Sequence, residues 1–249
     1  MPDVTALIKG FADQVAVVTG ASSGIGRAIA LELAAQGSAL CLIGRDEERL
    51  NACAQTARKK NVAVQTFRLD LTDDQEMGRL VSRLLDEHPE IHILVHSSGA
   101  WHKGTIETVP VAELDRLYRI NLRAPYLLTQ GLLPALKSAR GQVVFINSTQ
   151  GLGAAETVGP YAATKHGLKA LADSLRKEIN ADGVRVISFF PGTTATHGSE
   201  KIFAQEGKSF QSELLLQPED VAGMVVNTLS VPRTAEVTDV NIRPMQKTY

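Results

Sequence analysis

Short apolar runs alternate along the chain with longer stretches in which apolar residues recur every three or four positions. The short runs are rich in β-branched residues and apolar at consecutive positions, which is typical of strands buried on both faces of a parallel sheet. The longer stretches have the periodicity of amphipathic helices. The predicted strands are 15–19, 39–43, 62–69, 91–95, 142–147, 184–190 and 236–242. The clearest predicted helices are 25–36, 46–60, 73–87 and 217–229.

This alternation predicts an α/β fold, in which a doubly wound sheet of seven parallel strands carries helices on both faces. In such a fold, ligands bind at the carboxyl ends of the strands, near the point where the strand order reverses. No obvious repeat, low-complexity segment or Pro/Ser-rich linker interrupts the 249 residues. We therefore expect one domain over 1–249, with 1–11 as an N-terminal extension and about 193–216 as a substrate-loop region.

Composition narrows the classes of function. The net charge is −1 with both signs mixed, so neither nucleic acid nor a membrane is an expected partner. No apolar run approaches the ~20 residues that span a bilayer, and no signal peptide is visible. Cys41 and Cys53 are the only cysteines and, like the six histidines, show no metal-ligand spacing. The sequence therefore predicts a cytoplasmic enzyme without a metal or a disulfide framework.

A glycine cluster follows the first predicted strand, in V-A-V-V-T-G-A-S-S-G-I-G-R-A-I-A at 15–30. Gly20 allows a sharp turn off the strand, Gly24 lets backbone amides approach a pyrophosphate, and Gly26 lets the next helix pack closely. The spacing is a variant of the common dinucleotide fingerprint. A glycine cluster alone can be only a turn, but its place between a buried strand and a helix indicates a binding loop.

A second motif, Y-A-A-T-K at 161–165, lies at the start of a predicted helix. Tyr161 and Lys165 are four residues apart, so they share one helix face, one turn from each other. Such a pair is most often a solvated contact in which the lysine stem lies along the ring. The alternative is a phenol and an ammonium placed together for proton transfer, and the other motifs favour it.

Together these motifs resemble the short-chain dehydrogenase/reductase family in their order and intervals, over roughly residues 12–243. In chain order they are T-G-A-S-S-G-I-G, Asn121 within a predicted helix, Ser148 after a strand, Tyr161 with Lys165, and P-G at 191–192. The resemblance implies a Rossmann sheet with strand order 3-2-1-4-5-6-7. It also implies an oxidoreductase that transfers a hydride between NADP(H) and a carbonyl/secondary alcohol substrate.

The resemblance also assigns the catalytic roles. Tyr161 is the general acid/base, Ser148 hydrogen-bonds the substrate oxygen, and Lys165 contacts the ribose of the nicotinamide. Asn121 holds a water that relays protons to Lys165; the alternative is a buried Asn bonded to the backbone. A cation about 4 Å from a phenol contributes ~4 kcal/mol at an effective dielectric near 20. We therefore expect Lys165, with the positive nicotinamide, to bring the pKa of Tyr161 towards neutrality.

The cofactor site is expected to draw on every strand end near the switch point. Its predicted residues are Gly20, Ser22, Ser23, Gly24, Ile25, Gly26, Arg45, Asp70, Leu71, Ser98, Gly99, Tyr161, Lys165, Pro191, Gly192, Thr194 and Thr196. One segment departs from the family pattern, because H-S-S-G at 96–99 stands where N-N-A-G is common. The small residues preserve backbone access there, while side-chain contacts with the cofactor are in question.

The choice of NADP(H) rests on the end of the second strand. A protein that selects NAD usually places Asp or Glu there to bind the ribose 2′-hydroxyl. Gly44 stands there instead, followed by Arg45, whose cation suits a 2′-phosphate. Asp46 is expected to be the N-cap of the next helix and not a ribose ligand. The alternative for Arg45 is a solvated loop charge.

Function and substrate remain open at the sequence level between several alternatives. A regulator that binds NADP without catalysis, and a family dehydratase or epimerase, share the same loop. Segments 100–103, 150–159 and 193–211 supply both apolar and charged pocket candidates, so a simple ketone and a carboxylate- or phosphate-bearing substrate are both compatible. The apolar surplus on helices 112–137 and 161–180 fits a homodimer or homotetramer, as in similar proteins, or core packing.

Overall fold

The computed structural model describes residues 10–246, which form one sheet of seven parallel strands. The order β3-β2-β1-β4-β5-β6-β7 confirms the predicted topology. The strands are β1 (Val15–Thr19), β2 (Ala39–Gly44), β3 (Val64–Arg68), β4 (Ile93–His96), β5 (Gln142–Ile146), β6 (Arg185–Pro191) and β7 (Asp239–Ile242). All seven predicted strands are present, with ends that differ from the prediction by no more than a few residues.

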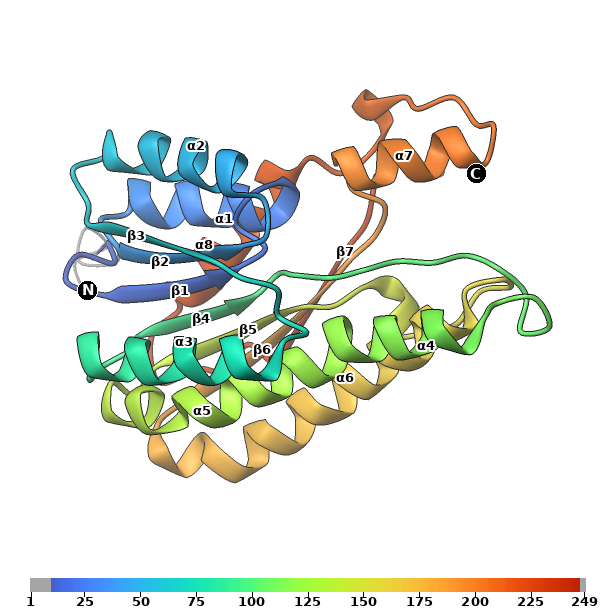
Figure 1. Cartoon of the computed structure of the whole chain (residues 1–249). Helices are drawn as coiled ribbons and strands as arrows, with labels where there is room; N and C mark the ends of the chain where they lie inside the picture. The colour runs from blue at the N-terminus through green and yellow to red at the C-terminus, as the bar shows by residue number, and fades with distance from the viewer. Residues whose placement is uncertain (1–9, 247–249) are drawn as a thin grey trace.

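Two layers of helices sandwich the sheet (Figure 1). On one face lie α1 (Gly24–Ala35), α2 (Glu47–Arg58) and α8 (Pro218–Leu229). On the other lie α3 (Asp74–Glu87), α5 (Ala124–Ser138) and α6 (Gly159–Ile179). Successive strand residues point to opposite faces, so Val17 and Val18 enter different cores. Both faces are covered, which explains why the strands are apolar at consecutive positions.

The strand order reverses beside β1. Thr19 at its end pairs with Ile43 of β2 on one side and with His96 of β4 on the other. After β1 and after β4 the chain therefore leaves the sheet towards opposite faces, and a crevice forms between the two departing segments. This crevice is where the predicted glycine loop and the H-S-S-G segment meet.

The predicted long helix at 112–137 consists of three parts. It begins with α4 (Val111–Tyr118), continues as a π-helical turn (Arg119–Arg123) and ends as α5. Asn121 lies at the centre of the π-helical turn and is buried. Such turns insert an extra residue into a helix and are frequent at functional sites.

Residues 193–216 leave the sheet after β6 and return beside their starting point. Thr194 forms an isolated parallel bridge with Leu216, and the amide of Ala195 donates to the carbonyl of Leu216 at 2.7 Å. Between these ends lies α7 (His197–Gln205), which stands off from the sheet in Figure 1. Phe203 and Phe210 pack edge to face, 5.5 Å between ring centres. These two rings therefore contact each other within the substrate-loop region.

The predicted N-terminal extension, 1–11, falls mostly outside the described residues, which begin at Gly10. Phe11 is buried in the hydrophobic core between the sheet and helices α1, α2 and α8. The folded domain therefore includes the last residue of the segment that was expected to extend beyond it.

Candidate active site

Ser148, Tyr161 and Lys165 converge beyond the carboxyl end of β5. Ser148 follows that strand by two residues, and its hydroxyl hydrogen-bonds the Tyr161 phenol. Lys165 Nζ donates to the carbonyl of Ile146, the last residue of β5, at 3.1 Å. It lies 5.9 Å from the centre of the Tyr161 ring. The structure thus brings together three of the four predicted catalytic residues, two of them one turn apart on α6.

Burial shifts the pKa values of both Tyr161 and Lys165. Burial raises the pKa of the Tyr161 phenol, and the hydrogen bond with Ser148 offsets this only in part. Burial also lowers the pKa of Lys165 to about 8. Lys165 directs its ammonium to the Ile146 carbonyl, while desolvation disfavours the phenolate. The predicted shift of the Tyr161 pKa towards neutrality depends on the bound oxidised cofactor as well as on Lys165, and it stays a prediction.

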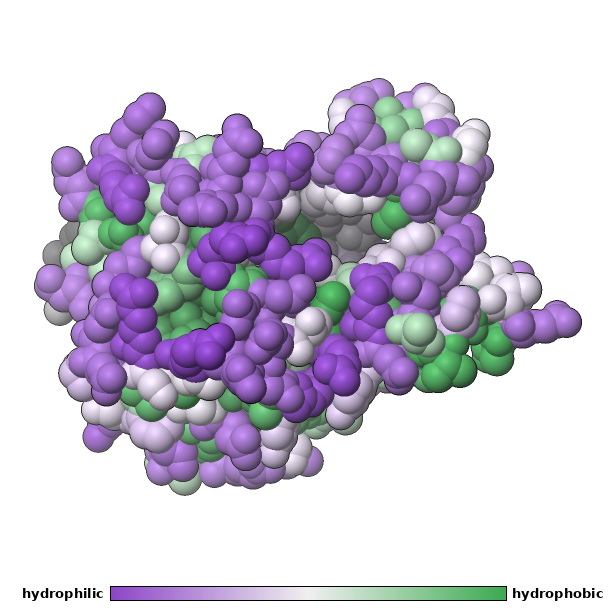
Figure 2. Space-filling view, viewed as in Figure 1, coloured by the Kyte–Doolittle hydropathy of each residue, from purple (hydrophilic) through white to green (hydrophobic). Residues whose placement is uncertain are grey.

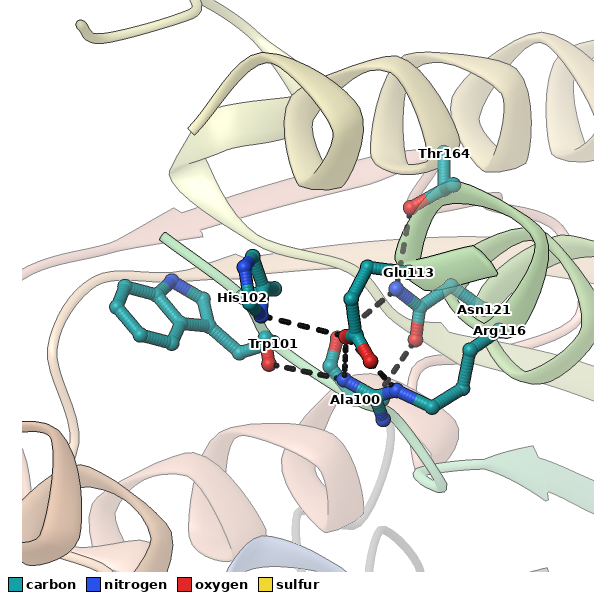
Figure 3. Close-up of polar contacts among 7 residues, drawn as sticks. All are labelled: Ala100, Trp101, His102, Glu113, Arg116, Asn121 and Thr164. Atoms are coloured by element: carbon teal, nitrogen blue, oxygen red, sulfur yellow. Dashed lines mark hydrogen bonds and ion pairs between the residues drawn. The ribbon is translucent and has the colours of Figure 1, made fainter. Parts of the chain in front are cut away.

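Asn121 provides a polar link between β4 and α6. Its side chain accepts from the Ala100 amide at 2.8 Å and donates to the Ala100 carbonyl at 2.9 Å. It also donates to Thr164 Oγ1 at 3.1 Å (Figure 3). Thr164 in turn donates to the Tyr161 carbonyl at 2.7 Å. This geometry matches the alternative of a buried Asn bonded to backbone, while the proposed water relay to Lys165 stays a prediction.

Two further residues, Thr164 and Asn147, support the site and were not predicted from the sequence. Asn147 Nδ2 donates to the Lys165 carbonyl at 3.1 Å, and its Oδ1 accepts from the Ser148 amide at 2.9 Å. A Cβ on Gly151 would lie 2.6 Å from that Oδ1, so the loop after β5 packs tightly against α6. The only sequence signal for Asn147 was a polar residue that ends an apolar strand.

The glycine loop has the geometry that its residues predicted. Gly20 and Gly24 have φ of +70° and +54°, a region that favours glycine. A Cβ on Gly20 would lie 2.9 Å from the Ser98 amide nitrogen, and one on Gly26 would lie 2.4 Å from the Gly20 carbonyl oxygen. Side chains at these positions would therefore separate the loop from the H-S-S-G segment and from α1.

The H-S-S-G segment is held by Thr19 and by its own histidine. Thr19 Oγ1 accepts from the amides of Ser97 and Ser98, at 3.0 and 3.2 Å. His96 Nε2 contacts Thr129 Oγ1 at 2.8 Å, and its ring stacks on Phe145 with centres 4.9 Å apart. Burial lowers the pKa of His96 to about 3. The departure from the family pattern therefore places a neutral imidazole in the core.

Arg45 and Asp70 face each other at the far end of the crevice. Arg45 Nη1 lies 3.9 Å from Asp70 Oδ2, and the arginine side chain is 70% exposed. Partial burial raises the pKa of Asp70, but hydrogen bonds from Thr72 and the Arg45 charge more than offset this, and the net shift is downward. Asp46 accepts from the Arg49 amide at 3.0 Å, which confirms its prediction as an N-cap.

Contacts also place three other predicted cofactor residues, Ser22, Thr196 and Thr194. Ser22 lies beside Gly44, since a Cβ there would be 3.2 Å from Ser22 Oγ. Thr196 caps α7 and lies against the glycine loop, its Cγ2 3.1 Å from where a Cβ on Gly24 would be. Thr194 instead donates its hydroxyl to the Gly192 carbonyl at 3.0 Å.

Five further predicted positions can be placed by their elements or by their neighbours. Ile25 lies in the first turn of α1, and Pro191 ends β6. Leu71 and Ser98 line a small recess together with His96. Gly99 adjoins the catalytic residues, because a Cβ there would lie 3.5 Å from Asn121 Oδ1 and 3.9 Å from Lys165 Nζ.

A pocket of about 500 Å³ opens between α4, α7 and the segment after β4. Figure 2 shows the hollow between the lobe that carries α7 and the body of the molecule. Its lining residues are Trp101, His102, Lys103, Glu113, Arg116, Ile202, Gln205 and Glu206. Segments 100–103 and 193–211 were predicted as pocket candidates. Glu113 and Arg116 were not, because their only signal in the sequence was an i, i+3 charge pair on a helix.

Two features are absent from the part of the chain that the structure describes. Within residues 10–246, no cluster of three or more His, Cys, Asp or Glu side chains has the arrangement of a metal site. In the same part of the chain, no helix combines the length and the apolar character needed to traverse a bilayer.

Known proteins resemble the chain over nearly its whole length. A family model described as short chain dehydrogenase matches residues 14–207. An uncharacterized oxidoreductase of Staphylococcus epidermidis is 34% identical over 234 residues, 94% of this chain and 98% of that protein. An alcohol dehydrogenase from Thermococcus sibiricus, solved with 5-hydroxy-NADP, has a TM-score of 0.86 at 27% identity, covering 95% of this chain and 99% of its own. A metagenomic short-chain oxidoreductase solved with NADP has a TM-score of 0.82 at 30% identity, with the same coverage.

Proposed function

The chain belongs to the short-chain dehydrogenase family, and we propose that it is an NADP(H)-dependent oxidoreductase that interconverts a carbonyl compound and a secondary alcohol. The observation that carries this proposal is the meeting of Ser148, Tyr161 and Lys165 beside Gly99, at the carboxyl ends of the strands. A phenol, a hydroxyl and an ammonium in one partly buried site can donate the proton that carbonyl reduction needs and orient the carbonyl oxygen.

The residues of the crevice fit a dinucleotide with a 2′-phosphate. Among the residues that the structure describes, α1 has no acidic side chain in its first turn and its N-cap Ser23 makes no side-chain capping bond, so its N-terminal amides remain free as donors for a pyrophosphate. Arg45 is exposed at the end of β2, where a 2′-phosphate would accept its hydrogen bonds. The NADP in the metagenomic relative and the 5-hydroxy-NADP in the Thermococcus enzyme support the same assignment.

The cofactor, when bound, supplies the hydride for reduction or accepts it in oxidation. In reduction, Tyr161 donates its phenolic proton to the carbonyl oxygen, and its raised pKa keeps that proton in place at neutral pH. Ser148 orients the same oxygen, and Lys165 favours the phenolate that is left behind. Asn121 and Thr164 hold the backbone around Tyr161 in place.

The test is consumption of NADPH with a panel of aldehydes and ketones, compared with NADH at equal concentration. We expect turnover that prefers NADPH. Cofactor binding without turnover of any compound would favour a regulator instead. Interconversion of substrate without net cofactor oxidation would favour a dehydratase or epimerase. Equal or better efficiency with NADH would overturn the choice of cofactor.

We also propose a homodimer or homotetramer in the cytoplasm. Leu127 and Leu133 of α5 and Leu171 of α6 are only half buried, although they pack against the core, and Tyr126 beside them is 46% exposed. A second copy covering these helices would bury this apolar surface. Sedimentation at micromolar concentration measures the state, and a monomer would contradict the proposal.

A further inference from the structure

The pocket beside α7 is unusually polar for a substrate pocket, since such sites are lined mainly by apolar and aromatic side chains. All of its lining residues except Trp101 and Ile202 are charged or polar. The polar ones come from three separate segments: 102–103 after β4, 113–116 on α4, and 205–206 at the end of α7.

The charges in this pocket compensate one another. Lys103 Nζ contacts Glu206 at 2.6 Å, and Arg116 contacts Glu113 at 2.8 Å. His102 Nδ1 also lies 3.2 Å from the Glu113 carboxylate (Figure 3). Among the lining residues two cations thus face two carboxylates, and Lys208, outside the lining, also contacts Glu206, at 2.7 Å.

This lining disfavours three kinds of substrate. An apolar ketone would remove water from ionised groups without replacing their hydrogen bonds, which is costly. A carboxylate or phosphate would meet cations that are already paired and two ionised carboxylates that repel it. An ammonium-bearing substrate would likewise find no uncompensated carboxylate. Hydroxyl groups avoid all three penalties, because they donate to carboxylates and accept from Arg116 and Gln205.

The pocket is close enough to the reactive site to hold the distal part of one molecule. Trp101 is two residues beyond Gly99, so their Cα atoms are at most about 7 Å apart. Gly99 in turn adjoins Lys165 and Asn121. Between them, the backbone of Ala100 is held on both sides by the Asn121 amide. A substrate whose carbon chain begins at Tyr161 therefore extends towards Trp101 and Glu113.

We infer that the substrate is a neutral, polyhydroxylated carbonyl compound, or the corresponding polyol, whose distal hydroxyl groups bind in the pocket of Trp101, Glu113, Arg116 and Gln205; this rests on the proposed oxidoreductase function. Trp101 offers a flat apolar face for the carbon-bound hydrogens of such a chain. Glu113 is held by Arg116 as an acceptor for hydroxyl donors.

The first experiment compares three kinds of open-chain alcohol as substrates for oxidation by the enzyme with NADP⁺. These are hexitols of both configurations at the second carbon, 2-hexanol, and 5-hydroxyhexanoate. Since two net hydrogen bonds contribute roughly 1–3 kcal/mol, we expect kcat/KM for the better hexitol to be about tenfold or more above both others. An equal or higher value for 2-hexanol or 5-hydroxyhexanoate would overturn the substrate class and leave the oxidoreductase function standing.

The second experiment does not depend on turnover. Trp101 is the only tryptophan of the chain, so its fluorescence reports on this pocket alone. In the complex with NADP⁺, we expect hexitols to change that fluorescence saturably, and 2-hexanol and 5-hydroxyhexanoate to do so only at about tenfold higher concentration or above. A saturable response without turnover would overturn the proposed function but not the ligand class. Absence of any response to the hexitols would overturn the inference.

A pair of matched variants locates the binding. Glu113→Gln keeps the size of the side chain but removes the charge that accepts hydroxyl donors, so the half-saturating hexitol concentration and KM should rise severalfold with little change in kcat. Glu107→Gln makes the same exchange at an exposed residue outside the pocket and should change neither. Equal effects of the two variants, or a fall in kcat alone for Glu113→Gln, would contradict the placement.

Discussion

The catalytic centre and the pocket beside α7 both depend on polar side chains, but these are held in different ways. In the catalytic centre most partners are backbone groups: Lys165 donates to a carbonyl of β5, and Asn121 binds both polar groups of Ala100. In the pocket, Glu113 and Glu206 pair with other charged side chains. Backbone partners are fixed by the sheet, whereas surface ion pairs can be exchanged without moving it. The chain therefore separates fixed reactivity from adjustable recognition.

The largest effect is expected from Tyr161→Phe, which removes the proton donor and leaves α6 intact. We expect kcat to fall by about 10²- to 10⁴-fold, the range for losing general acid–base catalysis, with little change in cofactor affinity. Steady-state kinetics and cofactor titration measure the two quantities. Tyr126→Phe, at an exposed phenol on α5, is the control. Near-normal turnover of Tyr161→Phe would end the proposed mechanism.

Arg45→Ala tests whether this exposed arginine selects NADP(H) over NAD(H). Loss of one charge-assisted contact should weaken NADP(H) binding about ten- to a hundredfold, since such a contact contributes ~1.5–3 kcal/mol. NAD(H) binding should change little. Arg49→Ala, which removes a cation paired with Asp46 on the same helix turn, is the matched control. Equal weakening of both cofactors by Arg45→Ala would show that the arginine acts as a general charge and not on the 2′-phosphate.

Thr164→Val tests the hydrogen bonds that support the catalytic centre. The variant removes the hydroxyl that accepts from Asn121 and donates to the Tyr161 carbonyl, and it leaves the Asn121 amide with one donor unpaired. The free energy of unfolding should fall by about 1–3 kcal/mol, measured by urea denaturation. Thr105→Val, at an exposed threonine, serves as the control. A Thr164 variant as stable as the parent would show that this bond does not hold α6 in place.

His96 makes the stability of the buried region depend on pH. Its pKa is about 3 in the folded chain against 6.5 for an unperturbed imidazole, so unfolding takes up a proton below pH 6.5. Its contribution is fully present above pH 6.5 and is lost as the pH falls towards 3, by up to about 1.4 kcal/mol per pH unit. Denaturation of His96→Asn between pH 5 and 7 should show a shallower slope. An unchanged slope would mean that other groups control acid unfolding.

The smallest effect is expected from Lys103→Ala. The ion pair with Glu206 is partly exposed, and such pairs contribute about 0–1 kcal/mol to the free energy of unfolding. Urea denaturation should therefore place this variant close to the parent. A loss as large as that of Thr164→Val would erase the distinction between the two regions.

The sequence was most informative where one physical demand dominates. Buried parallel strands must be apolar at consecutive positions, and a loop that turns sharply must use glycine, so the sheet and the positions of Gly20, Gly24 and Gly26 were predictable. The π-helical turn around Asn121 was not, because hydrophobic periodicity hardly registers one extra residue in a helix. The contact of the Lys165 ammonium with the Ile146 carbonyl was not predictable either, since it depends on how α6 packs against β5.

Residues that act through tertiary contacts were the hardest to find. Asn147 and Thr164 bond across elements that are distant in the sequence, and neither stands out from its neighbours. The ion pair of Glu113 and Arg116 reads in sequence as an ordinary helix-surface contact. Only the folded structure, in which α7 lies across the pocket from this ion pair, shows that the pair lines a pocket.

The parallel bridge between Thr194 and Leu216 joins the two ends of the segment that contains α7, so this segment is structurally separate from the sheet. Its ends are already joined at the sheet, and lengthening such a loop costs only about 0.6 kcal/mol per doubling. Residues 197–213 can therefore be exchanged for a longer or shorter segment while Tyr161 and the glycine loop keep their places. Genetic recombination at this junction, or a designed library confined to it, would diversify the compounds that the chain accepts and leave its reaction unchanged.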